Sequence, residues 1–219
     1  MDTNSNTRSN ESYLIILGLI LLSLIPSIAG TARLFQIMNN QVKADNLRFI
    51  SNPTPVITHI ISSTLFSILG AFQFSTELRI KYPRWHKYSG RLLLALVFLV
   101  SISGLWMTYV YPSVNHDGKL VYLFRLIVGY SILFFLLQSI RALLLKKFLY
   151  HGVWMTRAYA LSLGAGTQVF THIPLFIFPS LQGEASRAIA MGMGWIINIV
   201  VAEFIINKPK NKRISHEQS

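Results

Sequence analysis

The chain has 219 residues and no cysteine, with 52% hydrophobic residues, 13% charged residues and a formal net charge of +12. Because soluble domains carry about 25% charged residues, this composition indicates a membrane protein. The absence of cysteine excludes a disulfide scaffold, a cysteine-ligated iron–sulfur centre and a cysteine nucleophile. The basic residues lie in short clusters between apolar runs and not along one face, which excludes nucleic acid as a partner.

A membrane-spanning helix requires about 20 mostly apolar residues. Six segments meet this requirement and predict an all-α bundle with spans at about 13–32, 56–76, 92–111, 120–145, 156–178 and 188–206. A polar segment at 1–12 precedes the bundle, and a basic tail at 207–219 follows it. Pro26 and Pro174 lie inside predicted spans, where we expect local kinks. A cleaved leader ending near Ala29 is the alternative for the first segment, but the residues before it lack a positive cluster.

The basic residues between the predicted spans favour one orientation. Fourteen lie on the side that holds both termini: Arg8, Arg79, Lys81, Arg84, Lys87, Arg91, Arg141, Lys146, Lys147, Arg157, Lys208, Lys210, Lys212 and Arg213. Five lie on the opposite side: Arg33, Lys43, Arg48, Lys119 and Arg187. By the positive-inside rule, this bias places both termini in the cytoplasm. The sequence therefore predicts a multi-pass protein of the cell (plasma) membrane, surrounded by the lipid bilayer.

Polar side chains inside the predicted spans are the main candidates for function, because they are expensive in lipid unless they face the bundle interior. In the second span, His59 and Gln73 lie on one helical stripe with small residues between them. In the fifth span, Gln168 and His172 share a row, and we expect His172 at a depth similar to that of His59. Two histidines at one depth on separate helices suit iron ligation or proton transfer. The alternative is that each is an interior histidine bonded to a threonine or a carbonyl.

Two clusters lie at the cytoplasmic ends of predicted spans. Segments 83–91 and 151–159 each hold a histidine, a tryptophan, an arginine and a tyrosine. The candidate binding residues in these clusters are His86, His151, Arg84, Arg91 and Arg157. Arginine near a helix N-terminus suits a phosphate, a haem propionate or a lipid headgroup. The alternative is an interfacial aromatic belt with topogenic charges, which explains the tryptophans and lysines better than the histidines.

Two other charged residues carry specific expectations. Arg125, inside the fourth span, is expected either to extend toward the outer surface or to pair with Asp117. Glu203, near the inner end of the last span, is expected to meet the basic tail.

The stretch from His59 through Gln73-Phe74 and Pro83-Arg84-Trp85-His86 to Gly90-Arg91, followed by residues 151–160, resembles a known family. This is the predicted membrane-protein family called domain of unknown function 2306. The resemblance covers roughly residues 56–175, and the His-x-x-Trp-Met-x-Arg-x-Tyr-Ala stretch at 151–160 is its most specific part. It implies a multi-pass bacterial membrane protein and no particular activity. A weaker likeness, to di-haem b-type cytochromes such as the cytochrome b561 and ferric reductase group, rests on histidine pairs at two depths.

Three functions are compatible with these residues, and none decides whether the protein is an enzyme. The first is a transmembrane electron carrier with haem b and a quinone or other redox partner. His59 with His172 and His86 with His151 would then be ligands, Arg84, Arg91 and Arg157 would hold propionates, and Gly70, Gly164 and Gly166 would leave room for the macrocycle. The second is a solute- or lipid-binding or transport protein in which Gln73, Gln168 and the histidines line a cavity. The third is a non-catalytic accessory subunit. The electron carrier ranks first.

Overall fold

The computed structural model describes residues 3–41 and 47–208, and the side chains of residues 13–41 and 47–208. The described residues form helices and no strands. The elements are α1 (Thr3–Met38), α2 (Leu47–Ser51), α3 (Thr54–Ala71), the short 3-10 helix η1 (Phe72–Phe74), α4 (Thr76–Lys81), α5 (Pro83–Val110), α6 (Lys119–Leu144), α7 (Phe148–Ser162), α8 (Gly164–Thr171), α9 (Ile173–Ile177), the 3-10 helix η2 (Pro179–Leu181) and α10 (Glu184–Asn207).

Five stretches of the described chain are long and apolar enough to cross a membrane. They are Tyr13–Met38 in α1, Thr54–Phe74 in α3 and η1, and the whole of α5, α6 and α10. Each has 21 to 28 residues, enough for a hydrocarbon core of about 30 Å. Large apolar side chains such as Leu17, Leu137 and Phe204 are exposed on their outer faces. A lipid-facing surface accepts such side chains, because acyl chains are as apolar as leucine.

The fifth predicted span differs from a single helix. Residues 148–177 form α7, α8 and α9 in succession, with interruptions at Leu163 and His172. The second interruption precedes Pro174, which lacks the backbone N–H that would continue the helix. The first precedes Gly164, a residue type that propagates helices poorly. Pro26, by contrast, lies within α1 without interrupting it.

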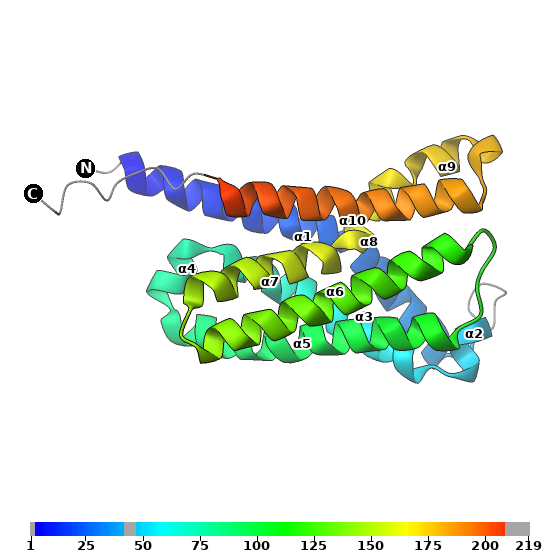
Figure 1. Cartoon of the computed structure of the whole chain (residues 1–219), viewed down its shortest axis with the longest axis horizontal. Helices are drawn as coiled ribbons and strands as arrows, with labels where there is room; N and C mark the ends of the chain where they lie inside the picture. The colour runs from blue at the N-terminus through cyan, green and yellow to red at the C-terminus, as the bar shows by residue number, and fades with distance from the viewer. Residues whose placement is uncertain (1–2, 42–46, 209–219) are drawn as a thin grey trace, which may run out of the picture.

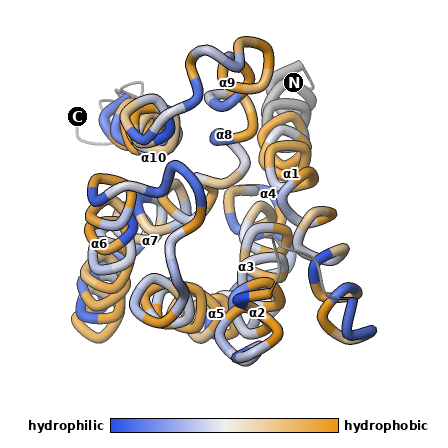
Figure 2. The backbone as a smooth tube through the Cα atoms, turned by 90° about the vertical axis from the view of Figure 1, so that its right-hand side faces the viewer, coloured by the Kyte–Doolittle hydropathy of each residue, from blue (hydrophilic) through white to orange (hydrophobic). Residues whose placement is uncertain are grey.

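The long helices run side by side along one axis (Figure 1). We call the end where α1 begins and α10 ends, which also holds α4 and the α6–α7 turn, the terminal end. The distal end is the opposite one, with α2, the α5–α6 loop (residues 111–118) and the start of α10. Figure 2, viewed from the distal end, shows α8 between α1 and α10, and it packs on both. The neighbouring α7 packs mainly on α6.

The main hydrophobic core lies among α3, α5, α6 and α7. It includes the fully buried Phe66 and Val97, with Ile132 and Tyr159 packed around them. The Tyr159 hydroxyl donates a hydrogen bond of 2.6 Å to the carbonyl oxygen of Ser67 and thereby joins α7 to α3. A β-carbon at Gly70 would overlap the Tyr159 ring, so this glycine permits the close approach. This core fixes α7 against its neighbours up to the interruption at Leu163.

Candidate functional site

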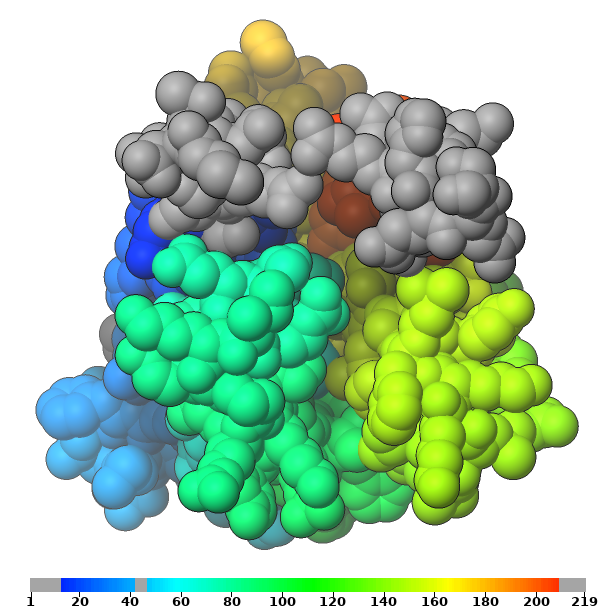
Figure 3. Space-filling view, turned by 90° about the vertical axis from the view of Figure 1, so that its left-hand side faces the viewer, coloured from blue at the N-terminus to red at the C-terminus, as the bar shows by residue number. Residues whose placement is uncertain are grey.

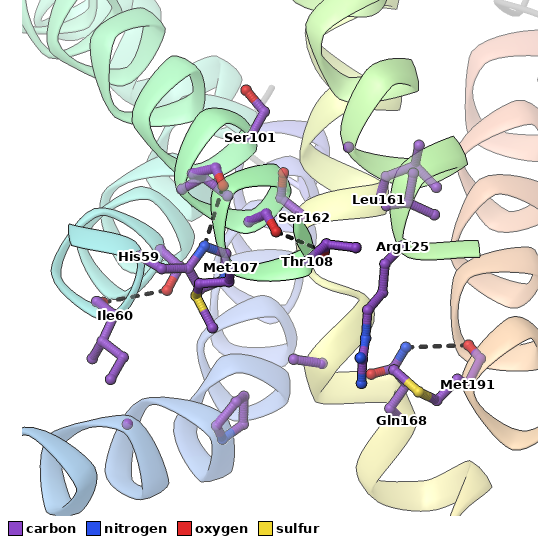
Figure 4. A pocket seen from close by; sticks show the side chains of 18 of the residues that line it. His59, Ile60, Ser101, Met107, Thr108, Arg125, Leu161, Ser162, Gln168 and Met191 are labelled. Atoms are coloured by element: carbon purple, nitrogen blue, oxygen red, sulfur yellow. Dashed lines mark hydrogen bonds between the residues drawn. The ribbon is translucent and has the colours of Figure 1, made fainter. Parts of the chain in front are cut away.

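A cavity of about 400 Å³ extends from the middle of the bundle to the distal end (Figure 4). Its size lies within the range of about 300–1,000 Å³ typical of small-molecule sites. The interruption between α7 and α8 forms part of its wall, through Ser162, Leu163 and Gly166. Non-helical backbone at membrane depth is tolerated where it lines a cavity, and discontinuous helices often build binding sites in transporters. The cavity is therefore the candidate functional site.

His59 forms part of the cavity wall on the α3 side. Its Nδ1 lies 3.2 Å from the carbonyl oxygen of Val100 and 3.1 Å from the hydroxyl oxygen of Ser103, both on α5. Because a carbonyl oxygen only accepts, we place the ring hydrogen on Nδ1. Nε2 is then the hydrogen-bond acceptor of the ring. The ring lies beside Gly104, where an added β-carbon would be in ordinary contact with it at 3.4 Å.

Hydroxyl groups supply most of the remaining polar wall. Six of them donate to carbonyl oxygens three or four residues earlier in their own helices: Ser23, Ser63, Ser67, Ser101, Thr108 and Ser162. Their hydrogens are therefore used within the helices, while their oxygens keep acceptor capacity. The Gln168 side-chain NH₂ donates 3.1 Å to the carbonyl oxygen of Met191, which leaves its Oε1 as a further acceptor (Figure 4). The wall thus presents many acceptors.

The distal mouth of the cavity holds a charged cluster around Asp117. The Asp117 carboxylate lies 2.8 Å from Nη1 of Arg125 and 2.6 Å from Nε of Arg187. Its side chain is 2% exposed, whereas those of the two arginines are 29% and 31% exposed. Burial raises the pKa of Asp117, but the hydrogen bond from Arg187 and the charge of Arg125 outweigh it and hold the pKa below its ordinary value. Arg125 thus pairs with Asp117, the second of the two arrangements expected from the sequence.

The structure brings two of the predicted polar residues of the second and fifth spans into this cavity and leaves two outside its wall. His59 and Gln168 line it. His172, at the end of α8, bonds through Nδ1 to the carbonyl oxygen of Gln168 at 2.8 Å. Gln73, in η1, donates 2.7 Å to the hydroxyl oxygen of Ser89. His172 and Gln73 are not among the cavity-lining residues.

The two remaining predicted histidines lie at the terminal end. Figure 3 shows this end, with the segments around 75–90 and 145–155 as neighbours on one face. His151 Nδ1 lies 2.7 Å from the hydroxyl oxygen of Ser139 on α6. His86 Nδ1 is buried without a hydrogen-bond partner among the described residues. The charges of Arg79 and His151 reach His86, so the two histidines are near one another.

The three predicted arginines of this end are placed differently from one another. Arg84 and Arg91 are exposed, and Arg91 lies over the Tyr88 ring. Arg157 pairs with Glu203 on α10, with distances of 2.5 Å from Nε to Oε1 and 3.0 Å from Nη2 to Oε2. Glu203 therefore has a partner that was not predicted; its expected contact with the basic tail stays a prediction, because the tail from residue 209 onward lies outside the described residues.

The distal pair, His59 and His172, does not fit the haem site suggested by the sequence. A bis-imidazole site requires two histidines that face each other across open space, yet of the distal pair only His59 lines the cavity. The glycines expected to leave room are covered, Gly70 by Tyr159, Gly164 by Trp195 and Gly166 by Leu22. In the part of the chain that the structure describes, no group of three or more His, Cys, Asp or Glu side chains is arranged to hold a metal ion.

Comparison with known families supports the membrane assignment. The family model described as "Predicted membrane protein (DUF2306)" matches residues 56–206. The chain belongs to this family. The DUF2306 match runs from α3 to the last turn of α10, so it includes the α7–α8 interruption and most of the cavity wall. We found no match to the chain among curated proteins or among solved structures. The DUF2306 description names a membrane protein and no activity, so function is argued from the cavity.

Sequence reasoning missed the contribution of α5 to this cavity. Ser101, Gly104 and Thr108 follow one another at steps of three and four residues, which places them on one stripe of a helix. The stripe faces the cavity in the structure. The spacing was visible in the sequence, but hydroxyl residues alone do not distinguish a cavity wall from a helix–helix contact.

Proposed function

We propose that this protein is a membrane-embedded binding protein for a small solute that carries hydroxyl or amine groups. The supporting observation is the acceptor-rich cavity wall formed by His59, Gln168 and the six internally bonded hydroxyls. Acceptors inside an apolar bundle are unfavourable unless donors reach them. A solute with several O–H or N–H groups supplies those donors, and the cavity volume limits it to a small molecule.

The proposal includes a membrane topology. Residues 148–177 would form one more crossing, the fifth in chain order, as the interrupted series α7, α8 and α9, and would bring the total to six. Six crossings agree with the positive-inside bias and with the location of the start of α1 and the end of α10 at the terminal end (Figure 1). The terminal end would then face the cytoplasm of a cell with this protein in its plasma membrane, and the cavity would open to the outside. An interrupted helix beside a central site also suits transport of the solute.

The test is to fill the cavity and look for a retained small molecule. Thr64 lines the cavity, and Thr64→Phe adds a ring to the wall. Thr31 is exposed on α1 and donates only to its own helix, so Thr31→Phe is the matched control. Native mass spectrometry of the full chain in a non-ionic detergent should find a bound small molecule on the wild type and on Thr31→Phe. Its loss from Thr64→Phe alone supports the proposal, and equal behaviour of all three proteins refutes it.

The electron-carrier hypothesis predicts a different observable. A chain with haem b purified from haem-replete cells would show Soret and alpha bands in a reduced-minus-oxidised spectrum, and these bands would change when His59 or His172 is replaced by Ala. A colourless protein would remove haem and a quinone partner from consideration. The accessory-subunit hypothesis predicts neither a spectrum nor a retained solute.

A further inference from the structure

Four arginines from four separate elements converge at the distal mouth of the cavity. They are Arg33 of α1, Arg48 of α2, Arg125 of α6 and Arg187 of α10, and the charges of the other three all act on Arg48. The positive-inside count leaves five basic residues for this side of the protein; Arg33, Arg48 and Arg187 are among them, and Arg125 lies inside a span. Such convergence is not required for topology, because a topological charge acts from any position in its loop.

Among the described residues of the mouth, the carboxylates are fewer than the arginines Arg48, Arg125 and Arg187. Asp117 is shared between Arg125 and Arg187, and the exposed carboxylate of Glu184 lies against Gly118. Among the described residues, these two carboxylates face the guanidinium groups of Arg48, Arg125 and Arg187. This set carries a net positive charge, which favours anions and disfavours cations at the mouth.

Arg48 shows the effect of this imbalance most directly. It lines the cavity, its Nη1 donates to the carbonyl oxygen of Pro112 at 3.2 Å, and its Nε is buried without a hydrogen-bond partner in the described part of the chain. Burial and the charge of Arg125 lower the pKa of Arg48, and Asp117 offsets this only in part. A buried donor on a cation next to other cations is unfavourable until an anion reaches it.

We propose that the distal mouth binds an oxyanion, either a carboxylate or a phosphate group, between Arg48 and Arg125. Both arginines line the cavity, and a guanidinium fork matches these groups with paired hydrogen bonds. Asp117 positions Arg125 for this contact through their ion pair. The inference rests on the proposed function and completes its ligand: a hydroxylated oxyanion with its charge at the mouth and its hydroxyls directed to the acceptor wall beside His59.

The test uses the full chain in a non-ionic detergent and isothermal titration calorimetry. The probes are glycerol 3-phosphate and glycerate, which carry a charge and hydroxyls, inorganic phosphate, which carries the charge alone, and glycerol, which carries the hydroxyls alone. We expect the two hydroxylated anions to bind at least about tenfold more tightly than glycerol, as charged hydrogen bonds of ordinary strength require.

The variants separate the charge at the mouth from the cavity. Arg48→Gln removes a cation that has no ion-pair partner among the described residues, and it should weaken the anions about tenfold or more while leaving glycerol unchanged. Lys119→Gln removes the same charge from an exposed residue of the same end that does not line the cavity, so it is the matched control. Because Arg125→Gln alone leaves Asp117 with Arg187 as its remaining ion-pair partner among the described residues, the double variant Arg125→Gln/Asp117→Asn tests Arg125 without a change in the net charge of the cluster.

The outcomes distinguish this inference from the proposed function. Loss of anion binding in Arg48→Gln and also in Thr64→Phe supports the oxyanion site and solute binding in the cavity. Loss in Arg48→Gln alone supports the oxyanion site and refutes binding inside the cavity. Equal affinity for glycerol and the anions, sensitive only to Thr64→Phe, supports the cavity and overturns the oxyanion site. Absence of saturable anion binding at millimolar concentrations, or equal weakening by Lys119→Gln, also overturns the oxyanion site.

The same experiment identifies the source of the oxyanion. If an anionic lipid headgroup is the natural occupant of the mouth, nanodiscs of phosphatidylglycerol should abolish the binding of glycerol 3-phosphate by competition. Nanodiscs of phosphatidylcholine should leave that binding unchanged. An affinity that is the same in both nanodiscs and in detergent assigns the site to a free solute. Each of these results supports an oxyanion site.

Discussion

Replacement of Gly166 by Ala tests the position of α8, on which the cavity depends. Gly166 faces α1, and an added β-carbon would lie 3.0 Å from the carbonyl carbon of Leu22 and closer still to its carbonyl oxygen. Ordinary contacts begin at 3.4 Å. The carbonyl carbon must therefore recede by about 0.4 Å, the difference between these distances, and the oxygen by more. Because the obstacle is backbone, a change of rotamer cannot relieve it.

The expected loss of stability follows from two opposing effects. Overpacking costs about 1–3 kcal/mol, and the rigid neighbour places this site at the upper end of that range. Alanine in a helix gains about 1 kcal/mol over glycine, so the net loss is about 2 kcal/mol. Gly152 is the matched control, because it is an exposed glycine of α7 with nothing within 4 Å of an added β-carbon. Gly152→Ala keeps the gain and lacks the clash.

The measurement is thermal unfolding of both variants and the wild type in the same detergent, followed by tryptophan fluorescence. A difference of about 3 kcal/mol between the two variants corresponds to a Tm difference of about 6–12 °C for a chain of this size. We expect Gly166→Ala to melt below the wild type and Gly152→Ala at or above it. If the Tm of Gly166→Ala equalled that of Gly152→Ala, the close packing of α8 on α1 would be refuted.

Three further predictions concern charge and topology. Asp117→Asn should lower the free energy of unfolding by about 1–3 kcal/mol at pH 7. Because the folded-state pKa of Asp117 is depressed, the stabilisation by its carboxylate is complete above the unfolded pKa of about 3.9 and is lost as pH falls through the folded pKa. The stabilities of wild type and variant should therefore converge in acid. Glu203→Gln should cost only about 0.5–1 kcal/mol, since its pair with Arg157 is partly exposed, and thermal unfolding in high salt should shrink the difference. In this cysteine-free chain, Asn115→Cys should react with an impermeant maleimide from outside intact cells and Lys147→Cys only after permeabilisation; reaction of both from outside contradicts the topology.

Length and hydropathy sufficed to predict five of the spanning helices, because each apolar run is long enough to cross the bilayer alone. They did not reveal the interruption at Leu163. Leucine is as apolar as its neighbours, and the following glycines are tolerated in membrane helices, so the run is unremarkable by hydropathy. The close packing of these glycines involves residues from distant parts of the chain, Leu22 against Gly166 and Trp195 against Gly164, which hydropathy does not reveal.

In the candidate site, too, the sequence predicted the position of residues along a helix but not their contacts with other helices. Helical rise predicts the depth of His59 and His172 along the bundle, but two residues at one depth can point in different directions. His172 bonds back to its own helix, whereas His59 bonds to α5 and lines the cavity. The pair Arg157–Glu203 joins residues 46 positions apart, and no sequence spacing indicates such a contact.

The interruption at Leu163 links the cavity to the charged mouth. Before the interruption α7 packs on α6, and after it α8 packs on α1 and α10. The residues Ser162, Leu163 and Gly166 around the interruption line the cavity. Arg125 of α6 also lines the cavity and pairs with Asp117 at the mouth. A buried arginine and an acceptor-rich wall are both unfavourable in lipid when nothing binds them, so their presence in one space favours a single ligand that satisfies both.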